Sequence, residues 1–211
     1  MIKYLLLIIA YLIGSIPFGL IISKLKGIDI RQHGSKNIGS TNVARVLGFK
    51  YGLIVLLLDS LKGAIFVALF TLKILPNEYC LINPIIYGLA ATIGHSFSIY
   101  LRFKGGKAVA TTAGTLLAYD PILLVIALLV FFITVRITKY VSLGSLLGAA
   151  TALILSIVFT LVDIYTNIYQ YPYEKIYFPL ATFALTLLIL LRHRKNIEKL
   201  KNQTENKFEI K

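Results

Sequence analysis

The sequence has little charge and very little acid. Only 15% of its 211 residues are charged, and 9 Asp and Glu residues stand against 22 Lys and Arg. A soluble chain of this length carries more polar surface, so a soluble helical protein with a large core is disfavoured. Apolar residues are abundant instead: 57% of the chain is hydrophobic and the mean hydropathy is +0.80. These values are typical of a polytopic membrane protein.

Cysteine, histidine and clustered carboxylates are also scarce. The single cysteine, Cys80, excludes an intramolecular disulfide and a cysteine-rich metal site. With three histidines, no HExxH motif and no cluster of acidic residues, the sequence predicts neither a metal nor any other cofactor. It also lacks Pro- or Ser-rich linkers and internal repeats, so we expect one membrane-embedded domain over residues 1–211.

Long apolar segments occupy most of the chain. Lipid tolerates only helices and closed barrels, and the alternating pattern of a barrel is absent, so we predict an all-α fold. The predicted spans are residues 4–23, 51–72, 82–101, 108–118, 122–135, 141–162 and 176–191.

The region 108–135 allows one long tilted helix or two short helices that turn at Asp120-Pro121, a pair that favours a turn. Lys and Arg decide between these alternatives, because they accumulate in cytoplasmic loops. Two helices place all but four of the 22 Lys and Arg on one face, whereas one helix divides them almost evenly. The four exceptions are Lys3, Lys62, Lys73 and Lys175. We therefore predict seven transmembrane helices, with the N-terminus outside and the C-terminus cytoplasmic.

The segment RQHGSKNIGSTNVARVLG, Arg31 to Gly48, is polar, glycine-rich and basic. It has little to bury, so we expect a cytoplasmic loop and not a core element. Its GSKNIGST part nearly matches a nucleotide-binding phosphate loop, but Ser40 stands where that motif needs lysine. The glycines still allow backbone N–H groups to approach an anion, and Arg45 can form two parallel hydrogen bonds to phosphate. The alternative is a basic loop that only sets the topology.

A second glycine-rich stretch is FKGGKAVAT, residues 103–111, in which two lysines flank a Gly-Gly pair just before a predicted helix. A glycine turn at a helix N-terminus directs free N–H groups and the positive end of the helix dipole at one point. Two such stretches on one face suggest two phosphate sites. An ordinary turn with topogenic lysines is the alternative.

A few polar residues lie within or beside the predicted spans. Asp59 and Lys62 share one helical face, and each isolated charge near mid-bilayer costs about 2.5–3.5 kcal/mol. We expect them to pair or to face a polar cavity, which leaves a structural ion pair and a direct substrate contact both open. His95 is expected to be hydrogen-bonded and structural. His193 and Asn196, at the end of the last span, are a candidate base and phosphate donor, or ordinary interfacial residues.

Together these motifs resemble the acyl-phosphate:glycerol-3-phosphate acyltransferases, the PlsY family of bacterial membrane enzymes. The matching motifs are GSIPFG (14–19), GSKNIGSTNVARVLG (34–48), DSLKG (59–63), GHSFSIYLRFKGGKAVAT (94–111) and RHRKNIEKL with Glu205 (192–205). The resemblance covers nearly the whole chain in the family's order. It implies transfer of a fatty acyl group from acyl phosphate to glycerol 3-phosphate, giving lysophosphatidic acid and phosphate, as the first acylation step of phospholipid biosynthesis. The expected location is the bacterial cell (inner) membrane.

The resemblance also implies roles for individual residues. The catalytic residues would be Ser35, Arg45, His193 and Asn196. Substrate binding would involve Asn37, Thr41, Asn42, Lys104, Gly105, Gly106 and Lys107, with glycerol 3-phosphate on the KGGK loop. Glu205 would support the structure of the site, and we place Asp59 and Lys62 beside it as structural residues. Membrane lipid is an expected partner, whereas nucleic acid and an obligate protein partner are not.

The chain departs from the family pattern at five positions. Glycine is usual in the family where this chain has Lys36, Ala108 and Gln203. Alanine is usual at Ser40 and proline at Ser98. None of these changes removes a charged group.

The expected reaction needs no covalent enzyme nucleophile, because an acyl phosphate is already activated. We expect the glycerol 1-hydroxyl to attack the acyl carbon directly, with positioning contributing most of the acceleration. Lys, Arg and backbone N–H groups would stabilise the developing charge, and His193 or an acyl-phosphate oxygen would accept the proton. The competing function is an anion or phosphate transporter, although transporters concentrate charge near mid-membrane in repeated halves. A lipid-binding scaffold without activity is the remaining alternative.

Overall fold

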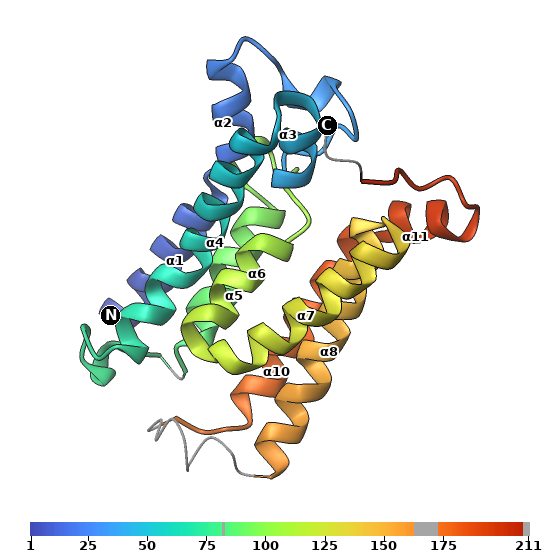
Figure 1. Cartoon of the computed structure of the whole chain (residues 1–211). Helices are drawn as coiled ribbons and strands as arrows, with labels where there is room; N and C mark the ends of the chain where they lie inside the picture. The colour runs from blue at the N-terminus through green and yellow to red at the C-terminus, as the bar shows by residue number, and fades with distance from the viewer. Residues whose placement is uncertain (82, 163–172, 209–211) are drawn as a thin grey trace.

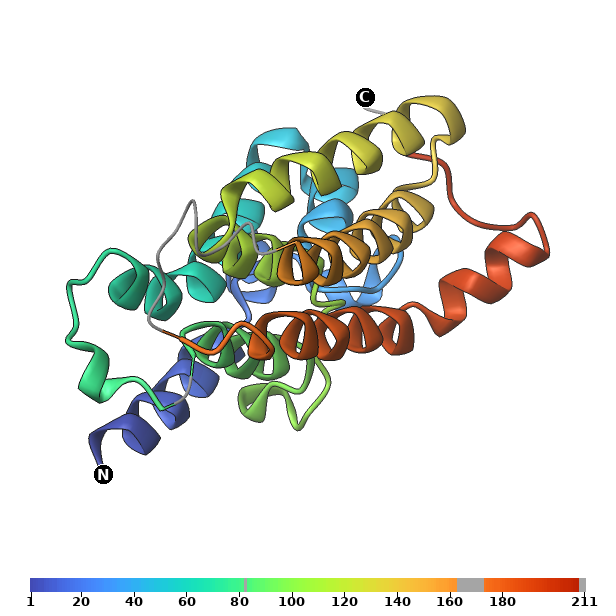
Figure 2. The ribbon, with the colours of Figure 1, turned by 90° about the horizontal axis from the view of Figure 1, so that it is seen from below.

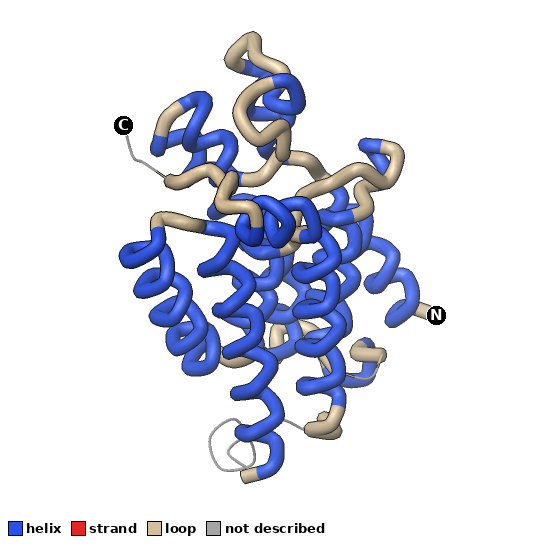
Figure 3. Tube along the Cα trace, turned by 90° about the vertical axis from the view of Figure 1, so that its right-hand side faces the viewer, coloured by secondary structure: helices blue, strands red, loops and turns tan. Residues whose placement is uncertain are grey.

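The computed structural model describes residues 1–81, 83–162 and 173–208, and in this part of the chain every regular element is a helix, as predicted (Figures 1 and 3). Among the described residues, four apolar helical segments are long enough to cross a membrane, and three are shorter. The four are Ile2–Leu25, Phe49–Thr71 (α4), Pro121–Thr138 (α7) and Val141–Leu161 (α8). The three are Ile85–Leu101, Val109–Tyr119 (α6) and Tyr177–Arg192 (α10). The number of crossings, seven by the charge argument, stays a prediction.

The first predicted span is divided into two helices. α1 covers Ile2–Ser15 and α2 covers Phe18–Leu25, with Ile16 and Pro17 between them. Proline has no N–H to donate and its ring clashes with the preceding turn, so it interrupts the helix. The predicted span 4–23 thus lies within the apolar segment Ile2–Leu25, which two helices form and not one. The third predicted span is also shorter than expected, since α5 covers Ile85–Ser96 and a 3₁₀ turn, η3, covers Ile99–Leu101.

The ambiguous region 108–135 forms two helices, as the distribution of basic residues predicts. α6 ends at Tyr119 and α7 begins at Pro121. The Asp120 side chain accepts a hydrogen bond from the Leu123 N–H at 2.9 Å, and proline at the first helical position has the backbone angle that a helix needs. The turn is therefore specified by the Asp-Pro pair itself.

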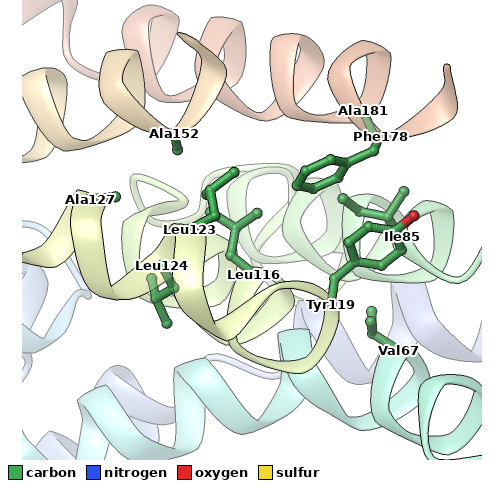
Figure 4. Packing of buried hydrophobic residues seen from close by; sticks show 10 residues of the cluster. All are labelled: Val67, Ile85, Leu116, Tyr119, Leu123, Leu124, Ala127, Ala152, Phe178 and Ala181. Atoms are coloured by element: carbon green, nitrogen blue, oxygen red, sulfur yellow. The ribbon is translucent and has the colours of Figure 1, made fainter. Parts of the chain in front are cut away.

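The helices pack in two groups that meet along α6, α7 and α10. α1, α4, α5 and α6 contact one another, and α8 contacts both α7 and α10 (Figures 1 and 2). The interface is filled by a buried apolar cluster in which the Tyr119 and Phe178 rings stack at 4.7 Å (Figure 4). α10 also packs on α5. The packing of this core fixes the orientation of α10 and so positions Arg192 and the residues that follow it.

The polar connections gather at one end of the bundle. They comprise residues 26–48, residues 97–108, the α7–α8 turn and α11 (Arg194–Lys201), whereas Met1 and the α4–α5 connection lie towards the other end (Figures 1 and 2). The segment 31–48 is not only loop, because η1 (Ile30–Gln32) and α3 (Ser40–Leu47) lie at or within it. Nor does it lack a core: Ile38 and Val43 are buried in one cluster with Leu20 and Val55. Our expectation that this segment buries little is wrong.

Candidate active site

A cavity of about 620 Å³ opens at the polar end of the bundle, between α3, α4, α6, α7, α8 and the α10–α11 junction. It collects most of the residues singled out in the sequence. Those that line it are Ser35, Asn37, Thr41, Asn42, Arg45, Asp59, Lys107, His193, Asn196 and Glu205. The other four, Lys62, Lys104, Gly105 and Gly106, are not among the lining residues. Lys104 is exposed on the loop before α6.

Asn42 organises the loop that precedes α3. Its Oδ1 accepts the Ser35 N–H at 2.8 Å, and its Nδ2 donates to the Asn37 carbonyl at 2.9 Å and the His33 carbonyl at 3.0 Å. The side chain is 2% exposed, so its hydrogen bonds are made inside the protein and not to solvent. Gly34 has φ +58°, and a Cβ there would collide with Asn42 Oδ1. Asn42 therefore shapes the loop, and Ser35 and Asn37 are placed at the cavity by it.

The first turn of α3 faces the same cavity. Ser40 and Thr41 are its first residues and line the wall, and no side chain caps the helix at Gly39. The free N–H groups of a first turn and the positive end of the helix dipole favour an anion. Arg45, one turn further along α3, also lines the cavity. This corner offers backbone donors and a guanidinium together.

A hydrogen-bond chain joins the opposite walls of the cavity. Lys107 Nζ donates to Asn196 Oδ1 at 2.6 Å, and Asn196 Nδ2 donates to Glu205 Oε1 at 2.7 Å. The same carboxylate oxygen accepts from Ser142 Oγ at 2.8 Å. Burial lowers the pKa of Lys107; nearby Glu205 opposes this shift, and Arg45 adds to it. Glu205 thus holds Asn196, and Asn196 holds the lysine.

His193 is buried, with one ring nitrogen already engaged. Its Nδ1 lies 2.8 Å from the Ile189 carbonyl, which can only accept, so Nδ1 carries the proton. Nε2 is then the acceptor of a neutral imidazole. Burial, reinforced by the Lys107 charge, lowers the pKa of His193 to about 4. The ring is therefore neutral at physiological pH.

The two glycines of KGGK use their N–H groups within the protein. The Gly105 N–H donates to the Ser96 carbonyl at 3.1 Å, and the Gly106 N–H donates to the His95 carbonyl at 2.9 Å. These groups are not free to bind an anion, contrary to our interpretation of the motif. Glycine is needed here for close approach: a Cβ on Gly105 would meet the His95 carbonyl, and one on Gly106 would meet the His95 ring.

Asp59 and Lys62 form a buried ion pair, with Lys62 Nζ 2.8 Å from Asp59 Oδ1, as the sequence predicts. Lys62 Nζ also donates to the Ile16 carbonyl at 2.9 Å, where α1 ends. His95 Nδ1 lies 3.7 Å from Asp59 Oδ1, too far for a hydrogen bond, and has no hydrogen-bond partner in the described part of the chain. The expectation that the His95 ring is hydrogen-bonded is wrong for this nitrogen. Asp59 and His95 both line the floor of the cavity.

The cavity lining contains many basic residues and several apolar ones. Its basic lining residues are Lys36, Arg45, Lys107, Arg192, Arg194, Lys195 and Lys199, and its acids are Asp59 and Glu205. The apolar wall includes Leu56 of α4, Val109 of α6 and Phe131 of α7. Such a site suits an anionic group attached to a long apolar one. No group of three or more His, Cys, Asp and Glu side chains that could hold a metal ion occurs among the described residues.

Sequence reasoning overlooked several lining residues. Arg192 was part of the RHRKNI motif, and its position directly before His193 could have drawn attention to it. Ser142 and Ser145 lie on α8, distant in sequence from the other polar motifs. Only the packing of α8 against α10 places them here.

Comparison with known proteins agrees with this architecture. Residues 4–203 match the family model described as glycerol-3-phosphate acyltransferase. Glycerol-3-phosphate acyltransferases of Bacillus velezensis and Bacillus subtilis are each 46% identical; the alignments cover 97% and 96% of this chain and 96% of each relative. The crystal structure of PlsY (YgiH), an integral membrane glycerol 3-phosphate acyltransferase, in its glycerol 3-phosphate form superposes with a TM-score of 0.82 at 36% identity, over 98% of this chain and 96% of that one. Its lysophosphatidic acid form gives a TM-score of 0.80 at 35% identity, over 99% of this chain and 96% of that one. The chain therefore belongs to the PlsY family of integral membrane glycerol-3-phosphate acyltransferases.

Proposed function

We propose that this protein transfers a fatty acyl group from acyl phosphate to glycerol 3-phosphate, forming lysophosphatidic acid and inorganic phosphate. The observation that carries the proposal is the cavity, whose lining combines many basic and polar residues with apolar residues of α4, α6 and α7. Both co-substrates carry phosphate and one carries a long acyl chain, so this combination suits the pair. Family membership supports glycerol 3-phosphate as the acceptor.

The two phosphates are assigned to different corners. The acyl phosphate group lies at the first turn of α3, where Ser40, Thr41 and Arg45 line the wall. Its acyl chain runs along the wall that Leu56 and Phe131 form. The phosphate of glycerol 3-phosphate lies near Lys107, whose lowered pKa reflects both burial and the nearby cations. An anion there relieves the repulsion among those cations.

The reaction is a direct acyl transfer. The 1-hydroxyl oxygen bonds to the acyl carbon, the bond between that carbon and the phosphate oxygen breaks, and inorganic phosphate leaves. The hydroxyl proton passes to His193 Nε2 or to an oxygen of the leaving phosphate. His193 is neutral with Nε2 as acceptor, so it can orient the hydroxyl even where the phosphate is the final proton acceptor. Arg45 and the α3 N–H groups stabilise the charge that develops on the phosphate.

The same proposal includes the setting of the enzyme. The chain is one domain that crosses a bacterial cytoplasmic membrane seven times, with the cavity on the cytoplasmic face. The gathering of the polar connections at one end of the bundle supports this arrangement (Figure 1), and so does the accumulation of Lys and Arg in those connections.

Purified protein in detergent tests the proposal. With acyl phosphate and glycerol 3-phosphate it should form lysophosphatidate and release one phosphate per product, and EDTA should leave the rate unchanged. Replacing acyl phosphate by acyl-CoA should give no product. Phosphate uptake by protein-containing liposomes, without acyl transfer, would instead support the transporter. Activity that EDTA abolishes and a divalent cation restores would overturn the metal-free mechanism.

A further inference from the structure

The peptide Gly105-Gly106 is held from two sides. Both of its N–H groups donate to carbonyls at the end of α5, those of Ser96 and His95. Both of its carbonyl groups point the other way and accept from a single side chain, that of Arg192 at the end of α10. The peptide thus bridges α5 and α10 and leads directly into Lys107.

Arg192 matches this task through the shape of its guanidinium. Nε donates to the Gly106 carbonyl at 3.0 Å and Nη2 donates to the Gly105 carbonyl at 2.6 Å. The guanidinium also lies 5.6 Å from the centre of the Phe97 ring, which steadies it from the side. Two donors at fixed spacing fit two successive carbonyls, whereas a lysine ammonium is a single point of charge.

A third contact ties the same two segments together. Lys107 Nζ donates to Asn196 Oδ1 at 2.6 Å. Arg192 and Asn196 stand on either side of His193 in the sequence, so the α10–α11 junction holds residues 105–107 at three points. His193, between those points, is consequently fixed relative to Lys107.

We propose that Arg192 is a positioning residue for acyl transfer, which holds the Gly105-Gly106 peptide so that Lys107 and His193 face the acceptor substrate together. This inference rests on the proposed function, because it assigns the phosphate of glycerol 3-phosphate to Lys107. It gives the glycine pair a purpose other than direct anion binding: the glycines allow the peptide to fit between His95 and Arg192. Arg192 acts through Lys107 and requires no contact with the reacting atoms.

The first test is Arg192→Lys, which keeps the charge and loses the paired donors. Loss of one charge-assisted hydrogen bond should raise the KM for glycerol 3-phosphate about tenfold or more. The KM for acyl phosphate should stay within about twofold, because the α3 corner is untouched. Arg102→Lys is the matched control: it makes the same exchange at an exposed site on the loop before α6 and should behave as wild type.

A second test does not depend on how well the substituted lysine packs. In Arg192→Ala, added guanidinium at millimolar concentration should lower the KM for glycerol 3-phosphate towards the wild-type value, while methylammonium should not. Calorimetric titration of glycerol 3-phosphate into the protein without acyl donor should show the same pattern of affinity. Each variant must elute from size-exclusion chromatography in detergent as a stable protein. If purified Arg192→Ala is not stable, the same guanidinium rescue of the KM for glycerol 3-phosphate should be measured in native membranes.

The outcomes distinguish a failure of the proposed function from a failure of the positioning role of Arg192. A wild-type protein that forms no lysophosphatidate overturns the proposed function. An active wild type with an unchanged KM in Arg192→Lys overturns the inference alone. A parallel rise in the KM for both substrates, or the absence of guanidinium rescue in Arg192→Ala, overturns the inference as well.

Discussion

Arg45 is the residue that distinguishes a phosphate-binding segment from a merely basic one. It lines the cavity from α3, one turn after the uncapped helix start. If the segment 31–48 only set the topology, any positive charge would serve at this position. If it binds a phosphate, the planar fork of the guanidinium matters as well.

We expect Arg45→Lys to insert normally and to lose at least tenfold in kcat/KM, with Arg45→Ala lower still. Loss of one donor that acts in the transition state typically costs about 2.7–4 kcal/mol, roughly 10²–10³ in rate. Steady-state kinetics at matched protein levels provide the measurement. Arg31→Lys is the control, since Arg31 pairs with Asp29 in the same segment outside the cavity. Equal activity of Arg45→Lys and wild type would show that the segment 31–48 only sets the membrane topology.

His193 should remain neutral well below the ordinary range of histidine. Its pKa is lowered to about 4 by burial and the Lys107 charge, against about 6.5 in an unfolded chain. Nitrogen-15 NMR of labelled histidine, assigned with His193→Gln, should show the Nδ1–H tautomer down to about pH 5. The unfolded chain then binds the extra proton, so the free energy of unfolding should fall as the pH drops from about 6.5 towards 4. A His193 resonance that titrates near 6.5 would contradict this picture.

At the scale of elements, several turns in the described part of the chain have left-handed backbone at residues that are not glycine, including three that lie in the motifs of the site segments. Lys36 has φ +60°, Ala108 has φ +72° and Gln203 has φ +56°. These are the three positions at which the resemblance to the family implies glycine. Glycine adopts this conformation without the Cβ clash that other residues suffer. The backbone of this chain is therefore locally strained at these three residues, and glycine there would relieve the strain.

Lys36→Gly and Gln203→Gly should each raise the thermal midpoint in detergent. Relief of about 1 kcal/mol of backbone strain corresponds to roughly 2–4 °C for a chain of this size. Glu198→Gly is the contrasting control: it lies inside α11, where glycine costs about 1 kcal/mol. A lower midpoint in both turn variants would show that their side chains stabilise the turns by more than the strain they cause.

A side chain of α4 supports the break that Pro17 makes between α1 and α2. Lys62 reaches the Ile16 carbonyl and Asp59 together, so one side chain satisfies the end of α1 and neutralises a buried acid. Asp59 is 2% exposed and Lys62 is 3% exposed. A single unpaired charge buried to this extent would strongly destabilise the fold.

Lys62→Met should therefore destabilise the protein by about 3–5 kcal/mol, because it leaves Asp59 buried and unpaired. The double variant Asp59→Leu/Lys62→Met should recover most of the thermal midpoint, and also most of the activity if the pair is structural. Lys50→Met, at an exposed site on the same helix, is the control. A double variant that is stable but inactive would instead make Asp59 a substrate contact.

At the scale of the whole molecule, the two ends of the bundle should face different compartments. In a chain with Cys80 replaced by alanine, Ile2→Cys should react with an impermeant maleimide on right-side-out vesicles. Lys207→Cys should react only after the membrane is permeabilised, because it follows α11 at the basic end. Labelling of Lys207→Cys from outside would refute the seven-span arrangement.

The sequence by itself determined the class of fold, the two helices of region 108–135 and the family. These follow from local or summed properties of the sequence. High hydropathy indicates a membrane protein, the Asp120-Pro121 pair specifies a turn, and the order of the motifs along the chain identifies the family. The Asp59–Lys62 pair was also predictable, because three residues of helix place both side chains on one face.

Only the tertiary structure decided how the motifs meet. The N–H groups of Gly105 and Gly106 looked free in sequence, yet α5 lies close enough to accept both. Asn42 was predicted as a substrate-binding residue, and only the structure shows that its side chain also holds its own loop through hydrogen bonds to Ser35 and Asn37. Arg192, Ser142 and His95 belong to three different helices, and their relation to Lys107 and Asn196 arises from helix packing. Contacts between residues far apart in sequence depend on which apolar faces bury one another, and a local pattern does not contain that information.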